Sequence, residues 1–236
     1  MSQSQVMKQA LIIGASSAIA KALIEELEQQ QVEVTSVSRS QLERSPHYLV
    51  DYDDEAINKW VKELNGQRFD YIYICNGVLH GQGVAPEKSL SAFNEQQFNE
   101  VIRANTLVPM LWLKHTPVLV PRNEPSVVTI FSARVGSISD NRLGGWYSYR
   151  ASKAALNMLV KTASVEVRRT HKQAKFVLFH PGTTDTPLSK PFQKNVPEHK
   201  LFTPMFVAQR LRELTLETQD LPECGYFDWD KSAIQF

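Results

Sequence analysis

Ala10-Leu11-Ile12-Ile13-Gly14-Ala15-Ser16-Ser17-Ala18-Ile19-Ala20 is the stretch that best indicates how this chain folds. It begins with four apolar residues, a run typical of a short strand that is buried on both faces. Small residues follow, and apolar residues then return at helical spacing through Leu23 and Leu27. The pattern predicts a buried strand, a tight turn and a helix.

The turn between this strand and this helix is a candidate phosphate-binding site. A helix N-terminus presents free backbone N–H groups and the positive end of the helix dipole, and small residues let a ligand approach closely. The same pattern also occurs as an ordinary tight connection in α/β folds, so the turn alone leaves both interpretations open. The candidate residues are Gly14, Ser16, Ser17, Ala18 and Ile19.

Further strands and helices alternate along the chain. Strands are predicted at 32–37, 48–51, 69–75, 126–131, 175–180 and 225–227, and helices after the first strand, at 55–64, from Asn94, around Tyr149 to about Arg168, and from Thr203. Alternation of this kind predicts βαβ crossovers and a parallel sheet. We therefore expect an α/β fold: a single doubly wound, Rossmann-like domain over residues 1–236, with about seven parallel strands and helices on both faces.

The end of the second predicted strand carries Ser38 and Arg39. In a dinucleotide-binding fold, an acidic residue at this position would bind the ribose 2′-hydroxyl and repel a 2′-phosphate. A hydroxyl followed by a guanidinium suits a 2′-phosphate, so these residues favour NADP(H) over NAD(H). The alternative is a surface arginine, which is common after a strand.

Small or polar residues also end the other predicted strands. Asp51 ends the third strand, and Asn76-Gly77 ends the fourth, where glycine lets a flat ligand lie on the backbone. Ser132 ends the fifth and is expected to face the crevice where α/β sheets bind ligands. A turn with three hydroxyls follows the sixth strand at 181–187, and the polar segment 188–202 is expected to be a mobile lid.

Tyr149 and Lys153 lie four residues apart in a predicted helix, so their side chains share one helix face. A cation beside a phenol favours the phenolate and lowers its pKa from about 10. Tyr149 would then be a proton donor and acceptor for carbonyl–alcohol interconversion near neutral pH. A pair with this spacing also arises by chance, so its meaning depends on its neighbours.

Asn94-Glu95-Gln96-Gln97 has the form of a capping box and begins a long helix that contains Pro109. Because proline has no N–H, the Asn105 carbonyl four residues earlier loses its helical hydrogen bond. A kink there would leave this carbonyl free to hold a water molecule. The alternative is a kink that relieves strain and has no chemical role.

The composition argues against several other classes of protein. A formal net charge of +1 in 236 residues creates no field that would attract nucleic acid or an acidic membrane. Cys75 and Cys224 form no C-x-x-C pair, and no metal site is expected. Residues 1–5 lack the pattern of a leader, and no apolar run reaches membrane-spanning length. We expect a soluble, cytoplasmic protein with no nucleic-acid or membrane partner.

The ordered motifs resemble the short-chain dehydrogenase/reductase family over nearly the whole chain. The stretch 14–20 is similar to the family's cofactor turn, and Cys75-Asn76-Gly77 to its Asn-Ala-Gly strand end. The segments 132–138, 149–155 and 227–230 further resemble C-factor-like proteins and small carbonyl reductases. The residues that resemble the catalytic tetrad are Asn105, Ser132, Tyr149 and Lys153.

The resemblance implies an NADP-dependent carbonyl reductase or alcohol dehydrogenase that acts on a small-molecule carbonyl or alcohol. Tyr149 would donate a proton to the carbonyl oxygen, Lys153 would lower the pKa of the phenol and bind the ribose, and Ser132 would hydrogen-bond the carbonyl oxygen. Asn105 would hold a water that links Lys153 to solvent. The implied cofactor-binding residues are Gly14, Ser16, Ser17, Ala18, Ile19, Ser38, Arg39, Asp51, Asn76, Gly77, Tyr149, Lys153, Pro181, Gly182, Thr184 and Thr186.

The resemblance also implies a homodimer or homotetramer through the Asn94 and Tyr149 helices, although their apolar faces could equally pack internally. A competing hypothesis is a C-factor-like signalling or regulatory protein that binds the cofactor with little or no turnover. Pocket walls are expected from 78–85, from the loop before Tyr149 and from 188–202.

The sequence departs from the family pattern at two places. Ala18 and Ala20 replace glycines, and the turn is expected to survive because both alanines are entering a helix. Ser132 lies further before Tyr149 than in many members, with 138–145 as the extra loop. This loop is expected to shape the substrate pocket, and it leaves Ser137 as a second candidate for the serine role.

Overall fold

The computed structural model describes residues 7–81, 83–216 and 220–236. The expectation that residues 1–5 carry no leader lies outside the described residues, as does Gln82 of the expected pocket wall. Within the described ranges, none of the helices is both long and apolar enough to cross a bilayer.

Seven parallel strands form the central sheet in the order β3-β2-β1-β4-β5-β6-β9, which confirms the expected fold. The order reverses between β1 and β4, so their carboxyl ends flank the crevice in which open α/β sheets bind ligands. The predicted strands are all present, with ends that shift by a residue or two. They are β1 (Gln9–Ile13), β2 (Glu33–Ser38), β3 (His47–Leu49), β4 (Tyr71–Ile74), β5 (Ser126–Phe131), β6 (Ala174–His180) and β9 (Cys224–Asp228).

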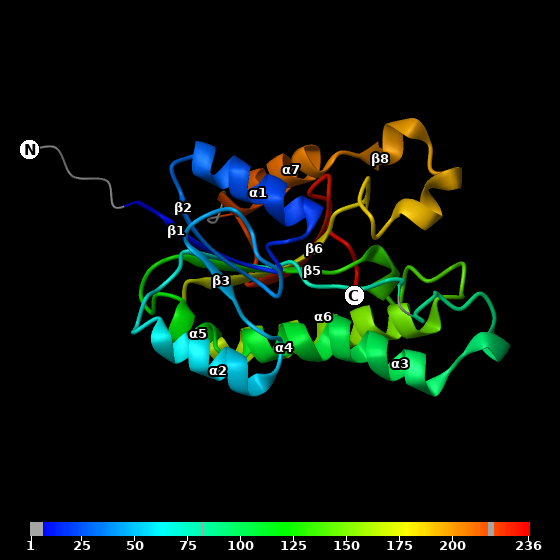
Figure 1. The fold of residues 1–236 in the computed structure, drawn as a ribbon, viewed down its shortest axis with the longest axis horizontal. Coiled ribbons are helices and arrows are strands. Elements are labelled where there is room, and N and C mark those ends of the chain that lie inside the picture. The colour runs from blue at the N-terminus through cyan, green and yellow to red at the C-terminus, as the bar shows by residue number, and fades with distance from the viewer. Residues whose placement is uncertain (1–6, 82, 217–219) are drawn as a thin grey trace, which may run out of the picture.

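Helices cover both faces of this sheet (Figure 1). One face carries α1 (Ala18–Gln29) and α7 (Pro204–Leu216), and the other carries α2 (Asp54–Glu63), α3 (Glu95–Ile102), α4 (Val108–Leu113), the short α5 (Thr116–Leu119) and α6 (Tyr147–Val167). Alternate side chains of β1 pack on opposite faces of the sheet. Leu11 and Ile13 pack on the side of α2, α4 and α6. Ala10 and Ile12 pack on the side of α1 and α7. The strand is therefore buried on both faces, as its uninterrupted apolar run predicts.

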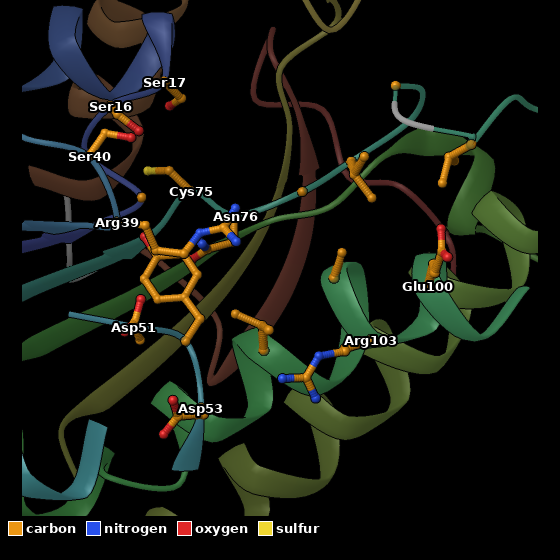
Figure 2. Close-up of a pocket in the computed structure, with 18 residues that line it drawn as sticks. Ser16, Ser17, Arg39, Ser40, Asp51, Asp53, Cys75, Asn76, Glu100 and Arg103 are labelled. Carbon is orange, nitrogen blue, oxygen red and sulfur yellow. The ribbon is translucent and has the colours of Figure 1, made fainter. Parts of the chain in front are cut away.

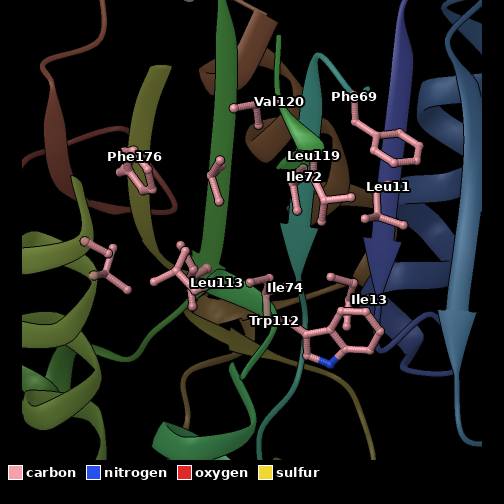
Figure 3. Close-up of a cluster of buried hydrophobic side chains, with 14 of the residues drawn as sticks. Leu11, Ile13, Phe69, Ile72, Ile74, Trp112, Leu113, Leu119, Val120 and Phe176 are labelled. Carbon is pink, nitrogen blue, oxygen red and sulfur yellow. The ribbon is translucent and has the colours of Figure 1, made fainter. Parts of the chain in front are cut away.

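The core on the α4 side is built around Trp112. Its ring packs edge-to-face on Trp60 of α2, with ring centres 5.7 Å apart. Figure 3 shows Ile13 and Ile74 reaching from the sheet toward the same ring. This packing anchors α4 on the sheet and so fixes the turn that precedes it.

The helix predicted from Asn94 is interrupted just before Pro109. After α3 the chain makes a π-helical turn, η2 (Arg103–Leu107), in which Val108 N donates to Arg103 O, and α4 follows. A π-helical turn is one way to absorb the donor that a proline removes. Asn105 lies in this turn, where the sequence indicated a local irregularity.

Side chains cap the N-termini of α1, α3 and α7. Ser17 Oγ accepts from Ala20 N at 3.3 Å, and α1 begins at Ala18, so Ala18 and Ala20 both lie within the helix as expected. Thr203 caps α7 in the same way. Asn94 caps α3, but the reciprocal half of the capping box is absent because Gln97 Oε1 accepts from the backbone N of residue 85.

The segment after β6 contains a small parallel ladder that the sequence did not predict. Its strands are β7 (Thr183–Thr184) and β8 (Leu201–Phe202), which are two residues long and too short to leave a periodic pattern. Between them run η4 (Lys190–Asn195) and η5 (Glu198–Lys200). The ladder therefore ties the turn after β6 to the end of the segment 188–202 that was expected to act as a lid. The remaining short helices are η1 (Leu90–Ala92) and η3 (Arg134–Gly136).

Candidate active site

Two cavities lie at the carboxyl ends of the central strands. The outer cavity has a volume of about 710 Å³ and the inner cavity about 500 Å³. They share part of their lining and form one groove across the point where the strand order reverses. The shared residues are Ser16, Ser17, Cys75, Asn76 and Gly77.

The β1–α1 turn forms the floor where the two cavities meet. Gly14 has a φ of +80°, and a Cβ built on it would lie 3.2 Å from the Cys75 carbonyl carbon. Gly14 N and Ala15 N donate to Val37 O at 2.9 and 3.1 Å, so the turn is held against both neighbouring strands. The first glycine is therefore required, and the predicted residues after it face the groove. Ser16 and Ser17 line both cavities, and Ala18 and Ile19 line the inner one.

Arg39 and Asp51 line the outer cavity, as predicted (Figure 2). The Arg39 guanidinium lies 5.2 Å from the centre of the Tyr52 ring, within range of a cation–π contact. Ser38 behaves differently: it is fully buried, and its hydroxyl donates to Ser40 O at 2.5 Å. Arg39 thus reaches the cavity, whereas Ser38 holds the turn that positions it.

The outer cavity also contains residues that were not predicted. Tyr52 and Asp53 follow directly after Asp51, and Arg103 comes from η2. Tyr52 could have been suspected from its place one residue beyond a predicted strand end. Arg103 had no such signal, because its position depends on how α3 and η2 pack against the sheet.

Asn76 presents an unpaired acceptor to the groove. Its Oδ1 is buried and has no hydrogen-bond partner within the described structure. Buried polar atoms are rarely left in this state unless a ligand or water completes them. Together with the glycine turn and Arg39, this acceptor fits a ligand that carries both hydroxyl and phosphate groups, such as a nicotinamide dinucleotide.

Tyr149 and Lys153 line the inner cavity on the first turns of α6. Lys153 Nζ donates to Phe131 O at 2.8 Å and lies 5.9 Å from the centre of the Tyr149 ring. Burial lowers the pKa of Lys153 to about 8, and burial raises the pKa of Tyr149 above its ordinary value. Burial is the main influence on the phenol and the Lys153 ammonium bonds to a carbonyl, so the expectation that Lys153 lowers the pKa of Tyr149 stays a prediction.

Ser132 lines the same cavity and is held from behind by α6. Its hydroxyl donates to Asn157 Oδ1 at 2.6 Å, and Asn157 Nδ2 donates to Gly136 O at 3.3 Å. Ser137 lies outside the lining of both cavities and contacts Ser139 Oγ at 3.3 Å. Of the two candidate serines, Ser132 is the one beside Tyr149. Asn157 was missed, although its spacing of four residues from Lys153 places it on the same face of the helix.

Asn105 is fully buried and lines neither cavity. Its Oδ1 accepts from Val78 N at 2.7 Å, and its Nδ2 donates to Val78 O at 2.9 Å and to Ser152 Oγ at 3.1 Å. A Cβ built on Gly77 would lie 3.5 Å from both Asn105 Oδ1 and Lys153 Nζ, so these residues do come together. Asn105 joins η2 to the chain beyond β4 and to α6, and its predicted hold on a water through the backbone carbonyl stays a prediction.

The turn after β6 contributes unequally to the groove. Thr186 lines the inner cavity, together with Pro187 and Leu188. Pro181, Gly182 and Thr184 are outside the lining of both cavities and shape the turn instead. Gly182 has a φ of +67°, and Thr184 Oγ1 donates to Pro181 O at 3.3 Å.

Comparison with known proteins agrees with this arrangement. Residues 8–197 match the family model described as short chain dehydrogenase. The 1-hydroxy-2-glutathionyl-2-methyl-3-butene dehydrogenase of Rhodococcus sp. (strain AD45) is 33% identical over 61% of this chain and 62% of its own length. Benzil reductase ((S)-benzoin forming) of Bacillus cereus is 23% identical over 92% of this chain and 97% of its own. C-signal of Myxococcus xanthus is 32% identical over 42% of this chain and 61% of its own.

Solved structures share the fold over almost the whole chain. A short-chain dehydrogenase/reductase from Burkholderia multivorans with bound NADP has a TM-score of 0.83 at 22% identity and covers 98% of this chain and 100% of its own. The carbonyl reductase Sniffer of D. melanogaster has a TM-score of 0.80 at 19% identity, with the same coverage. The fold, the site and the matched family model lead to one conclusion: the chain belongs to the short-chain dehydrogenase family of oxidoreductases.

Proposed function

We propose that this protein interconverts a small-molecule carbonyl and the corresponding alcohol with NADP(H), and that Tyr149 is the proton donor and acceptor. The observation that carries the proposal is that Tyr149, Lys153 and Ser132 line one cavity, which opens onto the β1–α1 turn. A proton-transfer group, a buried cation and a hydroxyl donor are the parts that a carbonyl reductase requires at its reacting oxygen.

The groove supplies groups for each part of the cofactor. Ser16, Ser17 and the N-terminus of α1 would bind the diphosphate, and Arg39 in the outer cavity would bind a 2′-phosphate. The unpaired Asn76 Oδ1 would accept from a ribose or amide donor. When bound, the nicotinamide supplies or accepts the hydride. The NADP in the related Burkholderia structure supports this choice of cofactor.

Tyr149 holds its proton at neutral pH in the folded protein. Burial raises the pKa of the phenol and makes it a weaker acid, so it would give the proton to a carbonyl oxygen only as that oxygen gains charge. Ser132 would turn its hydroxyl from Asn157 to the same oxygen, and one such donor is worth about 3 kcal/mol to a transition state. Lys153 would help to stabilise the tyrosinate that remains. Carbonyl reduction is therefore the direction that we propose for neutral pH.

The decisive experiment replaces Tyr149 with phenylalanine. NADPH consumption by the wild-type protein with a panel of aldehydes and ketones should fall by about 10²-fold or more in Tyr149→Phe, since a general acid contributes 10²–10⁴-fold. Binding of NADPH, followed by fluorescence titration, should stay within about twofold, because the ring remains in place. Tyr147→Phe is the matched control, because Tyr147 begins the same helix and lines neither cavity. Equal turnover in Tyr149→Phe and Tyr147→Phe would contradict the assigned role.

The cofactor preference has a separate test at Arg39. Arg39→Ala should weaken NADPH binding by about tenfold or more and leave NADH binding nearly unchanged, because only NADPH carries the 2′-phosphate. Arg103→Ala is a matched control, since its side chain also lines the outer cavity and its loss tests for a general effect of charge. A wild-type protein that binds NADH far more tightly than NADPH would refute the preference.

The regulatory alternative is not favoured. The similarity to C-signal covers less than half of this chain, whereas the relative named as a benzil reductase matches over almost all of it. If the protein binds NADPH but turns over no carbonyl compound, the signalling or regulatory hypothesis would be favoured instead.

A further inference from the structure

A line of aromatic rings leads outward from the proton-donating phenol. The Tyr149 ring packs edge-to-face on Trp146, with centres 6.2 Å apart, and Trp146 packs on Phe192 at 5.2 Å. Phe192 in turn packs on His80 at 5.7 Å. These rings come from the start of α6, from η4 and from the chain beyond β4, so three separate segments supply one aromatic wall, defined here as Trp146, Phe192 and His80.

The backbone at Trp146 is held in a costly conformation. Its φ of 55° and ψ of 43° lie in the left-handed region, which costs a residue other than glycine about 1–2 kcal/mol. Trp146 N donates to Glu87 O at 2.6 Å, and Arg150 Nε donates to Gly145 O at 2.9 Å. The buried Glu87 carboxylate also accepts from Ser148 N at 3.2 Å. The surroundings thus fix this conformation, and it sets the indole beside Tyr149.

The far side of the wall is tied to the inner cavity. A hydrogen bond of 3.0 Å joins His80 Nε2 to the Pro187 carbonyl, and Pro187 and Leu188 line the cavity that contains Tyr149. Phe192 packs on both His80 and Trp146, so the three rings form one cluster beside the inner cavity, next to its lining residues Tyr149 and Pro187. Trp146, Phe192 and His80 are only partly buried, which leaves ring surface for a ligand.

The chemistry of the cavity beside this wall is mostly apolar. Phe131, Ile19, Pro187 and Leu188 contribute apolar surface, and the charged residues in its lining are Lys21 and Lys153. Lys153 Nζ is already bonded to Phe131 O. A substrate that reaches Tyr149 with its carbonyl oxygen would therefore place its remaining atoms against rings and aliphatic side chains.

Building on the proposed function, we propose that the substrate is an aromatic carbonyl compound whose ring packs against Trp146 and Phe192. Flat rings that meet at an edge or with an offset gain more than their buried area alone provides. A saturated ring of the same size would bury similar area but would lack that gain.

Matched pairs of substrates test the inference. The kcat/KM with NADPH is measured for benzaldehyde against cyclohexanecarbaldehyde, and for acetophenone against cyclohexyl methyl ketone. The wild-type protein should prefer the phenyl member of each pair by about tenfold, the amount expected for two aromatic contacts. Trp146→Leu and Phe192→Leu should each lower this ratio to about threefold, and the double variant should bring it close to one. The ratio is the readout because a change in the position of Tyr149 would affect both members of a pair alike. Phe93→Leu is the control, because Phe93 pairs with Phe98 away from the wall and its loss should leave the ratio unchanged.

The outcomes separate the inference from the proposed function. Wild-type turnover of both members at equal kcat/KM, or a phenyl preference that the double leucine variant leaves unchanged, would overturn the role of the aromatic wall but not the carbonyl reductase activity. The absence of turnover with every carbonyl compound would overturn the two together. Melting temperatures of the variants within a few degrees of the wild type would show that a changed ratio reflects the site and not loss of folding.

Discussion

Lys153 shows how a single side chain can couple the chemistry of the site to the stability of the fold. It is 2% exposed, and its ammonium donates to the Phe131 carbonyl. Burial penalises the charged form and lowers its pKa to about 8, against 10.5 for an ordinary lysine. The folded protein therefore binds this proton less tightly than the unfolded chain does.

The stability of the ligand-free protein should depend on pH through this residue. Below about pH 8, Lys153 is protonated in both the folded and the unfolded protein, and the folded protein bears the full cost of burying the charge. Between about pH 8 and 10.5, only the unfolded chain holds the proton. The free energy of unfolding therefore rises with pH over this interval. Relative to Lys153→Met, the wild type should gain about 1–3 kcal/mol over this interval. Urea unfolding of both proteins at a series of pH values measures the difference, because their other groups titrate alike. A difference that stays constant with pH would mean that Lys153 is not desolvated.

For single residues, the sequence predicted which side chains belong to the candidate site but not the hydrogen bonds that they make. Ser132, Tyr149 and Lys153 stood out because a strand end and a helical spacing each constrain where a side chain points. Ser38 ends a strand as well, yet its hydroxyl donates to Ser40 O, a contact that the strand pattern does not encode. Asn157 became meaningful only when α6 was packed against β5, since its bond to Ser132 crosses between elements.

Among the elements, the contact between η3 and α6 sets the position of Lys153. A Cβ built on Gly136 would lie 2.8 Å from Lys153 Cβ, 3.0 Å from the Lys153 carbonyl carbon and 3.1 Å from Asn157 Nδ2. The backbone of η3 thus approaches α6 as closely as a glycine allows. The helix that carries Tyr149 is held in place by this contact as much as by its apolar face.

Gly136→Ala should therefore displace the residues of α6 that contribute to the site. The added methyl would force η3 and α6 apart, which typically costs about 1–3 kcal/mol of unfolding free energy in a packed interior. The shift would also move Lys153 and Asn157, so we expect kcat/KM to fall by about tenfold or more. Thermal unfolding and steady-state kinetics test both effects, with Ser139→Thr as a control that adds a methyl at an exposed position. If Gly136→Ala keeps wild-type stability and activity, the η3–α6 contact is looser than these distances indicate.

The elements that the sequence predicted are those with a local hydrophobic pattern. Continuous apolar runs predicted the central strands, and apolar residues at the 3.6-residue period predicted the long helices. The π-helical turn at η2 was indicated only indirectly, through the donor that Pro109 lacks. The β7–β8 ladder is held by pairing between two dipeptides, and no local pattern encodes such a contact.

For the whole molecule, the outward side of α6 is the candidate surface for self-association. Met158 and Val165 are 67% and 55% exposed, and they lie seven residues apart on one side of the helix. Leu107, on the neighbouring η2, is 42% exposed. The packing of α6 beside α3, η2 and α4 brings these apolar side chains onto one helical layer. We predict that these exposed apolar side chains belong to an interaction surface.

The homodimer or homotetramer expected from the sequence should form through this layer. Placing glutamates at two of its apolar positions would bury charges without partners in the interface, so Met158→Glu combined with Val165→Glu should halve the mass measured by light scattering at micromolar concentration. Leu143→Glu is the matched control: Leu143 is 92% exposed but lies in the loop before α6, so its replacement should leave the mass unchanged. Because Lys153 and Tyr149 lie on the same helix, kcat should also fall in the double variant if assembly steadies α6. A monomeric wild-type protein, or a double variant of unchanged mass, would show that these apolar side chains serve no self-association.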